Sequence, residues 1–189
     1  RLTSDVYDAY AYKLGLGQRT GVEVSEAVGR LTTKSDSNYT ASLDVQAAIG
    51  QGNTVVSPIQ LATYAATLAN NGTRYRTHFV KATLDTNTGE VLSETKPEVM
   101  DVIEGTGNTF ELVRQGMKQV PSTISGKISS YPVPIACKTG TPQRSETYAS
   151  GKHYLNAMMV AYLPADDPQI AIGITIEYGG YGARTGDLV

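Results

Sequence analysis

The sequence is poor in several features that mark large classes of protein. It has a single cysteine, Cys137, which excludes an internal disulfide and a cluster of thiolate metal ligands. Its two histidines, His78 and His153, stand apart and lack the spacing of a metal site. The net charge is −2 and no long run of one sign occurs, so nothing in the charge pattern favours binding to nucleic acid or to an anionic membrane. The longest apolar stretches, such as Leu155–Leu163, are too short to cross a bilayer.

The composition and length of the sequence are typical of a globular domain. Hydrophobic residues make up 40% of the sequence and charged residues 18%, and 189 residues are enough for one sizeable core. The sequence has no internal repeat and no low-complexity segment. It begins at Arg1 without a methionine or a signal peptide, and it ends at Gly186–Val189, where a further helix is expected to begin. We therefore expect residues 1–189 to be one portion of a domain from a longer protein.

Three helices are predicted from cap signals and apolar spacing. The strongest covers residues 57–72, where Ser57 is the expected N-cap, Pro58 the first helical residue and Gln60 the partner in a capping box. Its apolar stripe is Leu61, Ala65 and Leu68, and Asn71-Gly72 provides a left-handed exit. The other two helices are expected over residues 4–15 and over residues 108–120, the latter with Asn108 and Glu111 at capping-box spacing and with Phe110, Val113 and Met117 facing inward.

The strand signals lie in the second half of the chain. A hairpin is predicted over residues 79–94, around a turn at 87–89. Three strands follow over residues 133–141, 154–163 and 170–178, and a short turn sequence joins the last two as an antiparallel pair. The last strand alternates isoleucines with small residues and carries no charge on either side, so we expect both its faces to be covered, with a helix close to the small-residue side. The sequence therefore predicts an α+β fold, an antiparallel sheet with packed helices.

The sequence Lys138-Thr139-Gly140-Thr141 ends the first of these three strands and has the chemistry of an anion site. A compact ammonium beside two hydroxyls suits a carboxylate, and a glycine lets a ligand's backbone lie against the strand. Strict alternation sends Lys138 and Thr139 to opposite faces, so both serve one site only if the edge of the strand lines the cleft. An edge strand also offers N–H and C=O groups to an extended peptide. This pattern predicts an edge strand that binds a peptide with a carboxylate end.

The same residues carry a family resemblance. The segment "CKTGTPQ" at 137–143 resembles the third signature motif of penicillin-binding transpeptidases and serine β-lactamases. Three further segments, "KLGLGQRTGVEV", "AIGQGNTVVSPIQLATYAATLANNGT" and "NAMMVAYLPADDPQIAIGITIEYGG", resemble successive parts of class B penicillin-binding proteins in the same order. The likeness covers most of the chain and leaves out only residues 79–120. It implies the C-terminal part of a transpeptidase domain, hence an incomplete piece of the β-lactamase/transpeptidase fold.

The resemblance implies a function and a role for each residue of the motif. Family members cross-link peptidoglycan through a serine acyl-enzyme formed on D-Ala-D-Ala stem peptides, and β-lactams acylate the same serine. By analogy Lys138 hydrogen-bonds a serine of the family's second motif, and Thr139 and Thr141 bind the substrate carboxylate. The N–H of Thr141 donates to the oxyanion and Gly140 keeps the strand open. The family uses no metal and no cofactor, and it works on the extracytoplasmic face of the bacterial membrane.

The nucleophile of the family is missing from these residues. The one Ser-x-x-Lys, Ser93 to Lys96, lies at the end of a hairpin and runs into Pro97, which disfavours a helix, and no Ser-x-Asn occurs. We expect both motifs upstream of Arg1, and we expect the 189-residue chain to be inactive alone. Two strands of the family's sheet would also be absent, which leaves the 170–178 strand unpaired and predicts self-association or pairing with the missing N-terminal half.

Three other functions stay open at this point. A serine β-lactamase and a β-lactam sensor domain share the fold, although the segment from Ala48 onward favours the transpeptidases. A relative that has lost its serine would be a non-catalytic peptidoglycan-binding module. Cys137 abuts the lysine, but its neighbours on the same strand face are Val133 and Ile135, so we expect a buried structural thiol.

Overall fold

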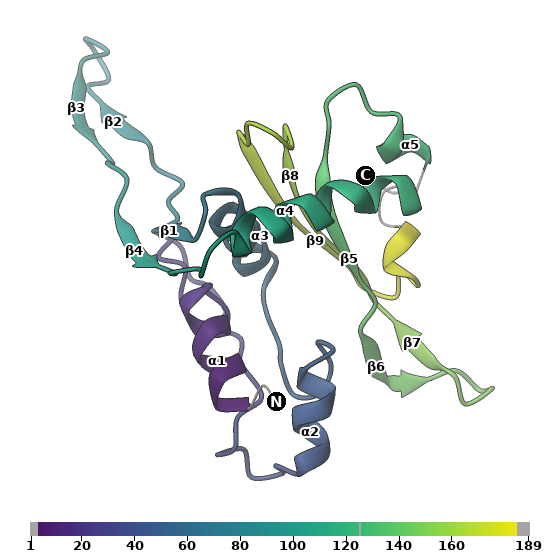
Figure 1. The fold of residues 1–189 in the computed structure, drawn as a ribbon. Helices are drawn as coiled ribbons and strands as arrows, with labels where there is room; N and C mark the ends of the chain where they lie inside the picture. Colours follow the sequence, from purple (N-terminus) through teal and green to yellow (C-terminus); the bar gives the residue numbers. More distant parts are fainter. Residues whose placement is uncertain (1–3, 125, 185–189) are drawn as a thin grey trace.

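The computed structural model describes residues 4–124 and 126–184, and it contains several small sheets, one of which forms the core with helices packed on it (Figure 1). The predicted start of a helix at residues 186–189 lies outside the described residues. The helices are α1 (Ser4–Lys13), α2 (Ala41–Ala47), α3 (Pro58–Ala69), α4 (Thr109–Gln119) and α5 (Gly126–Ser129), with 3-10 turns η1 (Val120–Thr123) and η2 (Gly182–Arg184). The strands are β1 (Thr73–Tyr75), β2 (Ala82–Leu84), β3 (Val91–Glu94), β4 (Val99–Val102), β5 (Ala136–Gly140), β6 (Gln143–Thr147), β7 (His153–Leu155), β8 (Ala157–Leu163) and β9 (Ile170–Ile176).

The core sheet has the order β5-β8-β9 and is antiparallel throughout. Lys138 lies opposite Val160, which in turn lies opposite Gly173. The prediction of an antiparallel pair over 154–163 and 170–178 is confirmed, with one correction. The first of these strands is divided at Asn156, because residues 153–155 leave the core sheet to pair with β6 as the hairpin β6–β7. The α+β prediction is confirmed, and within the described residues β5 and β9 are the two edge strands.

Helix α3 lies across the small-residue side of β9, as the sequence predicts. Its start has the full capping box: the Ser57 N–H donates to Gln60 Oε1 at 3.0 Å, and the Gln60 N–H donates to Ser57 Oγ at 3.4 Å. Its stripe Leu61, Ala65 and Leu68 is buried against Val160 and Tyr162 of β8. Asn71 and Gly72 leave the helix with positive φ angles of 55° and 91°, which is the predicted left-handed exit.

Gly173 lets α3 approach the sheet this closely. A β-carbon added at Gly173 would lie 2.6 Å from the backbone nitrogen of Ala62 and 2.8 Å from Leu61 Cβ. Gly173→Ala is therefore expected to lower the free energy of unfolding by about 1–3 kcal/mol, the usual effect of overpacking a core. Gly116→Ala is the matched control, because nothing lies within 4 Å of a β-carbon added there. Urea unfolding of both variants tests this, and equal midpoints would contradict the close packing of α3.

The isoleucine side of β9 differs from the expectation that both faces are covered. Cys137, Met159 and Ala161 are buried there, but Ile172 and Ile174 are only partly buried. A cavity of about 270 Å³ opens over them, and its mainly apolar lining comes from α5, β8, β9 and the segment between α5 and β5. Helices α3 and α4 thus pack on one face of the core sheet, and the described residues cover the isoleucine face of β9 only in part.

The start of α4 also differs from its prediction. Asn108 is the N-cap residue but makes no side-chain cap hydrogen bond. Glu111 does not complete a capping box, because its carboxylate accepts hydrogen bonds from Arg114 at 2.7 Å and Gln115 at 2.9 Å. Met117 is buried and Phe110 packs on the core as expected, whereas Val113 is 40% exposed. None of the helices in residues 4–124 and 126–184 is long and apolar enough to cross a membrane.

Candidate functional site: the outer edge of β5

The backbone of β5 presents every second residue to the edge that faces away from β8, called the outer edge below. The carbonyl of Pro142 accepts the Asn156 N–H at 3.0 Å, and the carbonyl of Pro134 accepts the Ala165 N–H at 2.8 Å, so even-numbered residues turn toward β8. Successive residues of a strand turn their N–H and C=O groups to opposite edges. The backbone groups of Thr139 and Thr141 therefore face the outer edge.

Lys138 reaches the outer edge although its own backbone faces β8. Its ammonium donates a hydrogen bond to the carbonyl of Thr139 at 2.6 Å. The side chain is exposed and borders a cleft of about 410 Å³, whose other lining residues are mainly apolar and belong to α3, α4, η1 and β8. The cation and the threonine backbone thus meet at one edge beside an open cleft, which is the arrangement that the sequence requires if both are to serve one site.

Thr141 is held through its side chain by a segment far along the chain. The Gly182 N–H donates to Thr141 Oγ1 at 2.9 Å. A hydroxyl that accepts from a backbone N–H keeps its own proton for another acceptor, such as a carboxylate. A β-carbon at Gly182 would lie 2.8 Å from the carbonyl carbon of Gly140, so this approach requires glycine. At Gly140 itself an added β-carbon would make only an ordinary 3.5 Å contact with Met158, so packing among the described residues does not require glycine there.

Two residues named in the sequence analysis are structural, as expected. Cys137 is fully buried, and burial raises the pKa of its thiol to about 11 although the nearby Lys138 lowers it. It is therefore a packed thiol and not a reactive one. Ser93 lies in β3, and its hydroxyl is 2.6 Å from that of Thr83 across the hairpin β2–β3, which projects away from β5 (Figure 1). Ser93 therefore does not lie on a helix one turn before Lys96, as a serine nucleophile and its lysine base would require.

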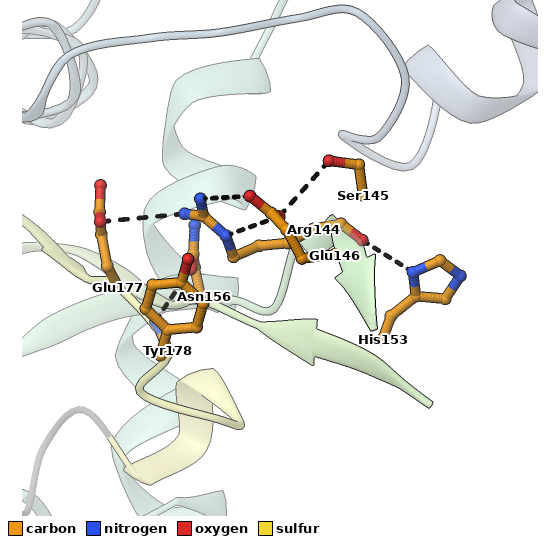
Figure 2. A network of polar contacts seen from close by, with 7 residues as sticks. All are labelled: Arg144, Ser145, Glu146, His153, Asn156, Glu177 and Tyr178. Atoms are coloured by element: carbon orange, nitrogen blue, oxygen red, sulfur yellow. Dashed lines mark hydrogen bonds and ion pairs between the residues drawn. The ribbon is translucent and has the colours of Figure 1, made fainter. Parts of the chain in front are cut away.

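The base of the hairpin β6–β7 is joined to the segment after β9 by a network that sequence analysis missed (Figure 2). The guanidinium of Arg144 donates two hydrogen bonds of 3.1 Å to the carboxylate of Glu146. It also lies 3.9 Å from Glu177 and stacks over the Tyr178 ring, with Cζ 4.4 Å from the ring centroid. The Tyr178 N–H donates to Asn156 Oδ1 at 3.0 Å. The network links the residues that follow Thr141 to the segment that carries Gly182.

The Arg144–Glu146 pair sets a pH dependence. Hydrogen bonds from Arg144 lower the pKa of Glu146 to about 2, from an ordinary value near 4.5. A carboxyl with a lowered pKa stabilises the fold above its unfolded pKa, and this contribution is lost as the pH falls through about 2. We expect a carbon-13 NMR titration of the Glu146 carboxyl to have its midpoint near 2. Arg144→Ala should move the midpoint up toward the ordinary range, whereas Lys152→Ala should leave it in place. An ordinary midpoint in the unaltered protein would refute the pairing.

Gln51 is the other residue whose role the sequence did not reveal. It lies between Gly50 and Gly52, in the turn after α2, and its side chain contacts the backbone of Thr141 and Gln143. In the sequence, Gln51 is marked only by the two flanking glycines, which predict a turn but not what the glutamine side chain contacts. Among the described residues no group of three His, Cys, Asp or Glu side chains is placed to hold a metal ion.

Comparison with known proteins identifies the family to which the chain belongs. The family model described as "Penicillin binding protein transpeptidase domain" matches residues 1–187. The chain is 32% identical to penicillin-binding protein 2A of Bacillus subtilis, over 92% of this chain and 25% of that protein. It is 30% identical to the peptidoglycan D,D-transpeptidase MrdA of Acinetobacter baumannii, over 97% of this chain and 30% of that protein. The structure superposes on penicillin-binding protein 2B of Streptococcus pneumoniae with a TM-score of 0.83 and 27% identity, over 98% of this chain and 31% of that one.

These matches identify the family and show how much of its members' length the chain covers. The chain spans about a quarter to a third of the length of these three proteins. Within that span the family model covers the core sheet, the Lys-Thr-Gly strand and the Gly-Gln-Gly turn. The chain belongs to the penicillin-binding protein transpeptidase domain family, as a fragment of a class B transpeptidase domain.

Proposed function

We propose that the chain is the C-terminal portion of the catalytic domain of a peptidoglycan D,D-transpeptidase, and that a longer polypeptide, called the complete protein below, carries out the reaction. The observation that carries this proposal is the outer edge of β5, where the backbone groups of Thr139 and Thr141 face outward and where the Lys138 ammonium binds the Thr139 carbonyl and borders an open cleft. The residues of a peptide with a carboxylate end would pair with this edge as an added strand.

The reaction requires a serine from another part of the complete protein. Its Oγ forms a bond to the carbonyl carbon of the penultimate D-alanine, the peptide C–N bond breaks, and the terminal D-alanine leaves with the serine proton on its amine. An amine of a second stem peptide then attacks the ester, and the serine recovers a proton. Thr141 stabilises both steps, because its N–H donates to the carbonyl oxygen as negative charge develops there.

The side chains of the motif bind the substrate before the bond is cleaved. The hydroxyls of Thr139 and Thr141 donate to the terminal carboxylate, and Lys138 supplies positive charge beside it and a donor for a neighbouring serine. A β-lactam carries a carboxylate and a carbonyl in the same relation, so it acylates the same serine. Stem peptides are exposed outside the cytoplasmic membrane, so the proposed substrate implies that this domain works on the extracytoplasmic face.

Labelled penicillin tests this proposal. The complete protein should be acylated stoichiometrically on a serine outside residues 1–189, and the isolated 189-residue chain should remain unlabelled. Acylation within the chain would overturn the division of the site between two segments. No acylation of the complete protein would favour a non-catalytic peptidoglycan-binding module. Rapid deacylation would instead favour a β-lactamase, since a transpeptidase releases penicillin slowly.

The edge strand β9 leads to a second proposal about the isolated chain. No strand of the described residues pairs with the side of β9 that faces away from β8. An unpaired edge associates with other strands, so the isolated chain should self-associate through β9 or pair with the N-terminal half of its own domain. Light scattering that shows a monomer at high concentration would contradict this.

A further inference from the structure

The carboxamide of Gln51 lies on the outer edge of β5, just beyond the Lys-Thr-Gly motif. Its Nε2 donates to the carbonyl of Thr141 at 3.4 Å, and its Oε1 accepts the N–H of Gln143 at 3.3 Å. Gln51 is 90 residues away from Thr141 in sequence, and its turn joins α2 to the segment that leads into α3. The contact therefore links two segments that lie far apart in the sequence at the end of the candidate site.

The two hydrogen bonds match those of a neighbouring strand. The carbonyl of residue i and the N–H of residue i+2 point to the same edge, and one residue of a parallel neighbouring strand meets both, because its N–H donates to that carbonyl and its C=O accepts from that N–H. The Gln51 amide has one donor and one acceptor that meet the same two groups, so it takes the place of the backbone N–H and C=O of one such residue. An incoming peptide can then pair with Thr139 and with the N–H of Thr141, but its pairing ends there because Gln51 occupies the next two groups.

The backbone around Gln51 restricts where its side chain can lie. Gly50 and Gly52 have positive φ angles of 75° and 87°, which strongly favour glycine. The Gln51 N–H donates to the carbonyl of Gln46 in the last turn of α2 at 2.9 Å. Gln51 itself is half-buried. A turn of this kind presents one side chain in a defined direction with little backbone freedom.

Thr141 is thereby held on three sides. Gln51 binds its carbonyl, Gly182 binds its hydroxyl, and the preceding residue Gly140 pairs with Met158 of β8. The N–H of Thr141 lies in the same residue as the carbonyl that Gln51 binds and points to the same edge. Any shift of that carbonyl moves the N–H as well.

We propose that Gln51 is a positioning residue that fixes the Thr141 N–H for the developing oxyanion and ends the peptide-binding edge at Thr141. This inference rests on the proposed function for the role of that N–H, whereas the contact itself does not depend on it. Gln51→Ala removes both hydrogen bonds. A misplacement of about 1 Å at a reacting centre costs on the order of 100-fold in rate, so we expect acylation of the complete protein by fluorescent penicillin to slow ten- to hundredfold.

Gln51→Glu separates positioning from a structural role. Near neutral pH its carboxylate faces the Thr141 carbonyl and repels it, but a protonated carboxyl restores one donor and one acceptor. The acylation rate of Gln51→Glu, divided by that of the unaltered protein at the same pH, should therefore rise as the pH falls from 7.5 toward 5, close to the ordinary pKa of about 4.3. The same ratio for Gln51→Ala should stay flat. Gln46→Glu is the control, because that glutamine is exposed on α2, and its ratio should stay near one.

Amide hydrogen exchange in the complete protein tests the contact independently of the chemistry. Exchange at the Gln143 N–H should become at least tenfold faster in Gln51→Ala and stay unchanged in Gln46→Ala. Unchanged exchange would overturn the contact, and unchanged acylation with faster exchange would overturn the positioning role. If the unaltered protein is not acylated at all, the proposed function fails and the exchange result alone decides whether Gln51 closes the edge. If Gln51→Ala does not fold, Gln51→Glu carries both tests.

Discussion

Lys138→Ala in the complete protein is expected to slow acylation by penicillin by about 10²–10³, the cost of removing one preorganised donor from a charge-stabilising site. The structure provides the reason. Lys138 is the cation at the outer edge of β5, its ammonium is 2.6 Å from the Thr139 carbonyl, and the cleft beside it is otherwise lined by apolar side chains. Under the proposed function, its loss removes the positive charge next to the substrate carboxylate and a donor for the neighbouring serine.

Two further variants define what the lysine contributes. Lys138→Arg keeps the charge but replaces a compact ammonium by a planar guanidinium, so we expect a rate between those of the alanine variant and the unaltered protein. Lys81→Ala removes an exposed lysine near the hairpin β2–β3 and should acylate normally. An alanine variant at 138 that reacts within twofold of the unaltered protein would show that the outer edge of β5 is not a wall of the site.

Gln60→Leu is expected to lower the free energy of unfolding by about 3–5 kcal/mol, because it leaves two backbone carbonyls and one backbone N–H without their partner, at a cost of roughly 1–3 kcal/mol each. Gln60 is completely buried at the start of α3. Its Nε2 donates to the carbonyls of Gln18 at 2.6 Å and Val28 at 2.7 Å, and its Oε1 accepts the Ser57 N–H in the capping box. One side chain therefore joins the glycine-rich N-terminal loops to the helix that packs on the sheet.

The control for this variant is Gln115→Leu, which removes an exposed glutamine from α4. A surface change of this kind is usually within about 0.5 kcal/mol. Chemical denaturation of both variants tests the comparison, and a loss at Gln60 no larger than the loss at Gln115 would contradict its role as a link between segments. The loss expected for Gln60→Leu is a large fraction of the total free energy of unfolding of a typical domain, which is about 5–15 kcal/mol.

The parts of the fold that local sequence determines were predicted well. The capping box of α3 needs only Ser57, Pro58 and Gln60, and all three act as their spacing predicts. The alternation of β9 predicts a helix close to Gly173, and α3 lies there. Lys138 and Thr139 were expected to share a site only through a strand edge, and β5 is an edge strand in the described residues.

The parts that depend on contacts between distant segments were not predicted. Asn108 is a residue type that favours the N-cap position, but Glu111 pairs with Arg114 and the capping box does not form. The predicted 154–163 strand is divided at Asn156 because residues 153–155 pair with β6. The spacing of apolar residues in the sequence does not indicate this pairing. Gln51 contacts Thr141 across 90 residues, so only the folded chain reveals it. Local patterns specify elements, whereas the site depends on which elements meet.

The most direct test of the account is a crystal structure of the complete protein acylated by penicillin. We expect the penicillin carboxylate to lie within hydrogen-bond distance of the Thr139 and Thr141 hydroxyls, the ester carbonyl oxygen to accept the Thr141 N–H, and Gln51 still to bind the carbonyl of Thr141. An acyl group bound away from β5, or an outer edge of β5 covered by another strand of the complete protein, would contradict it.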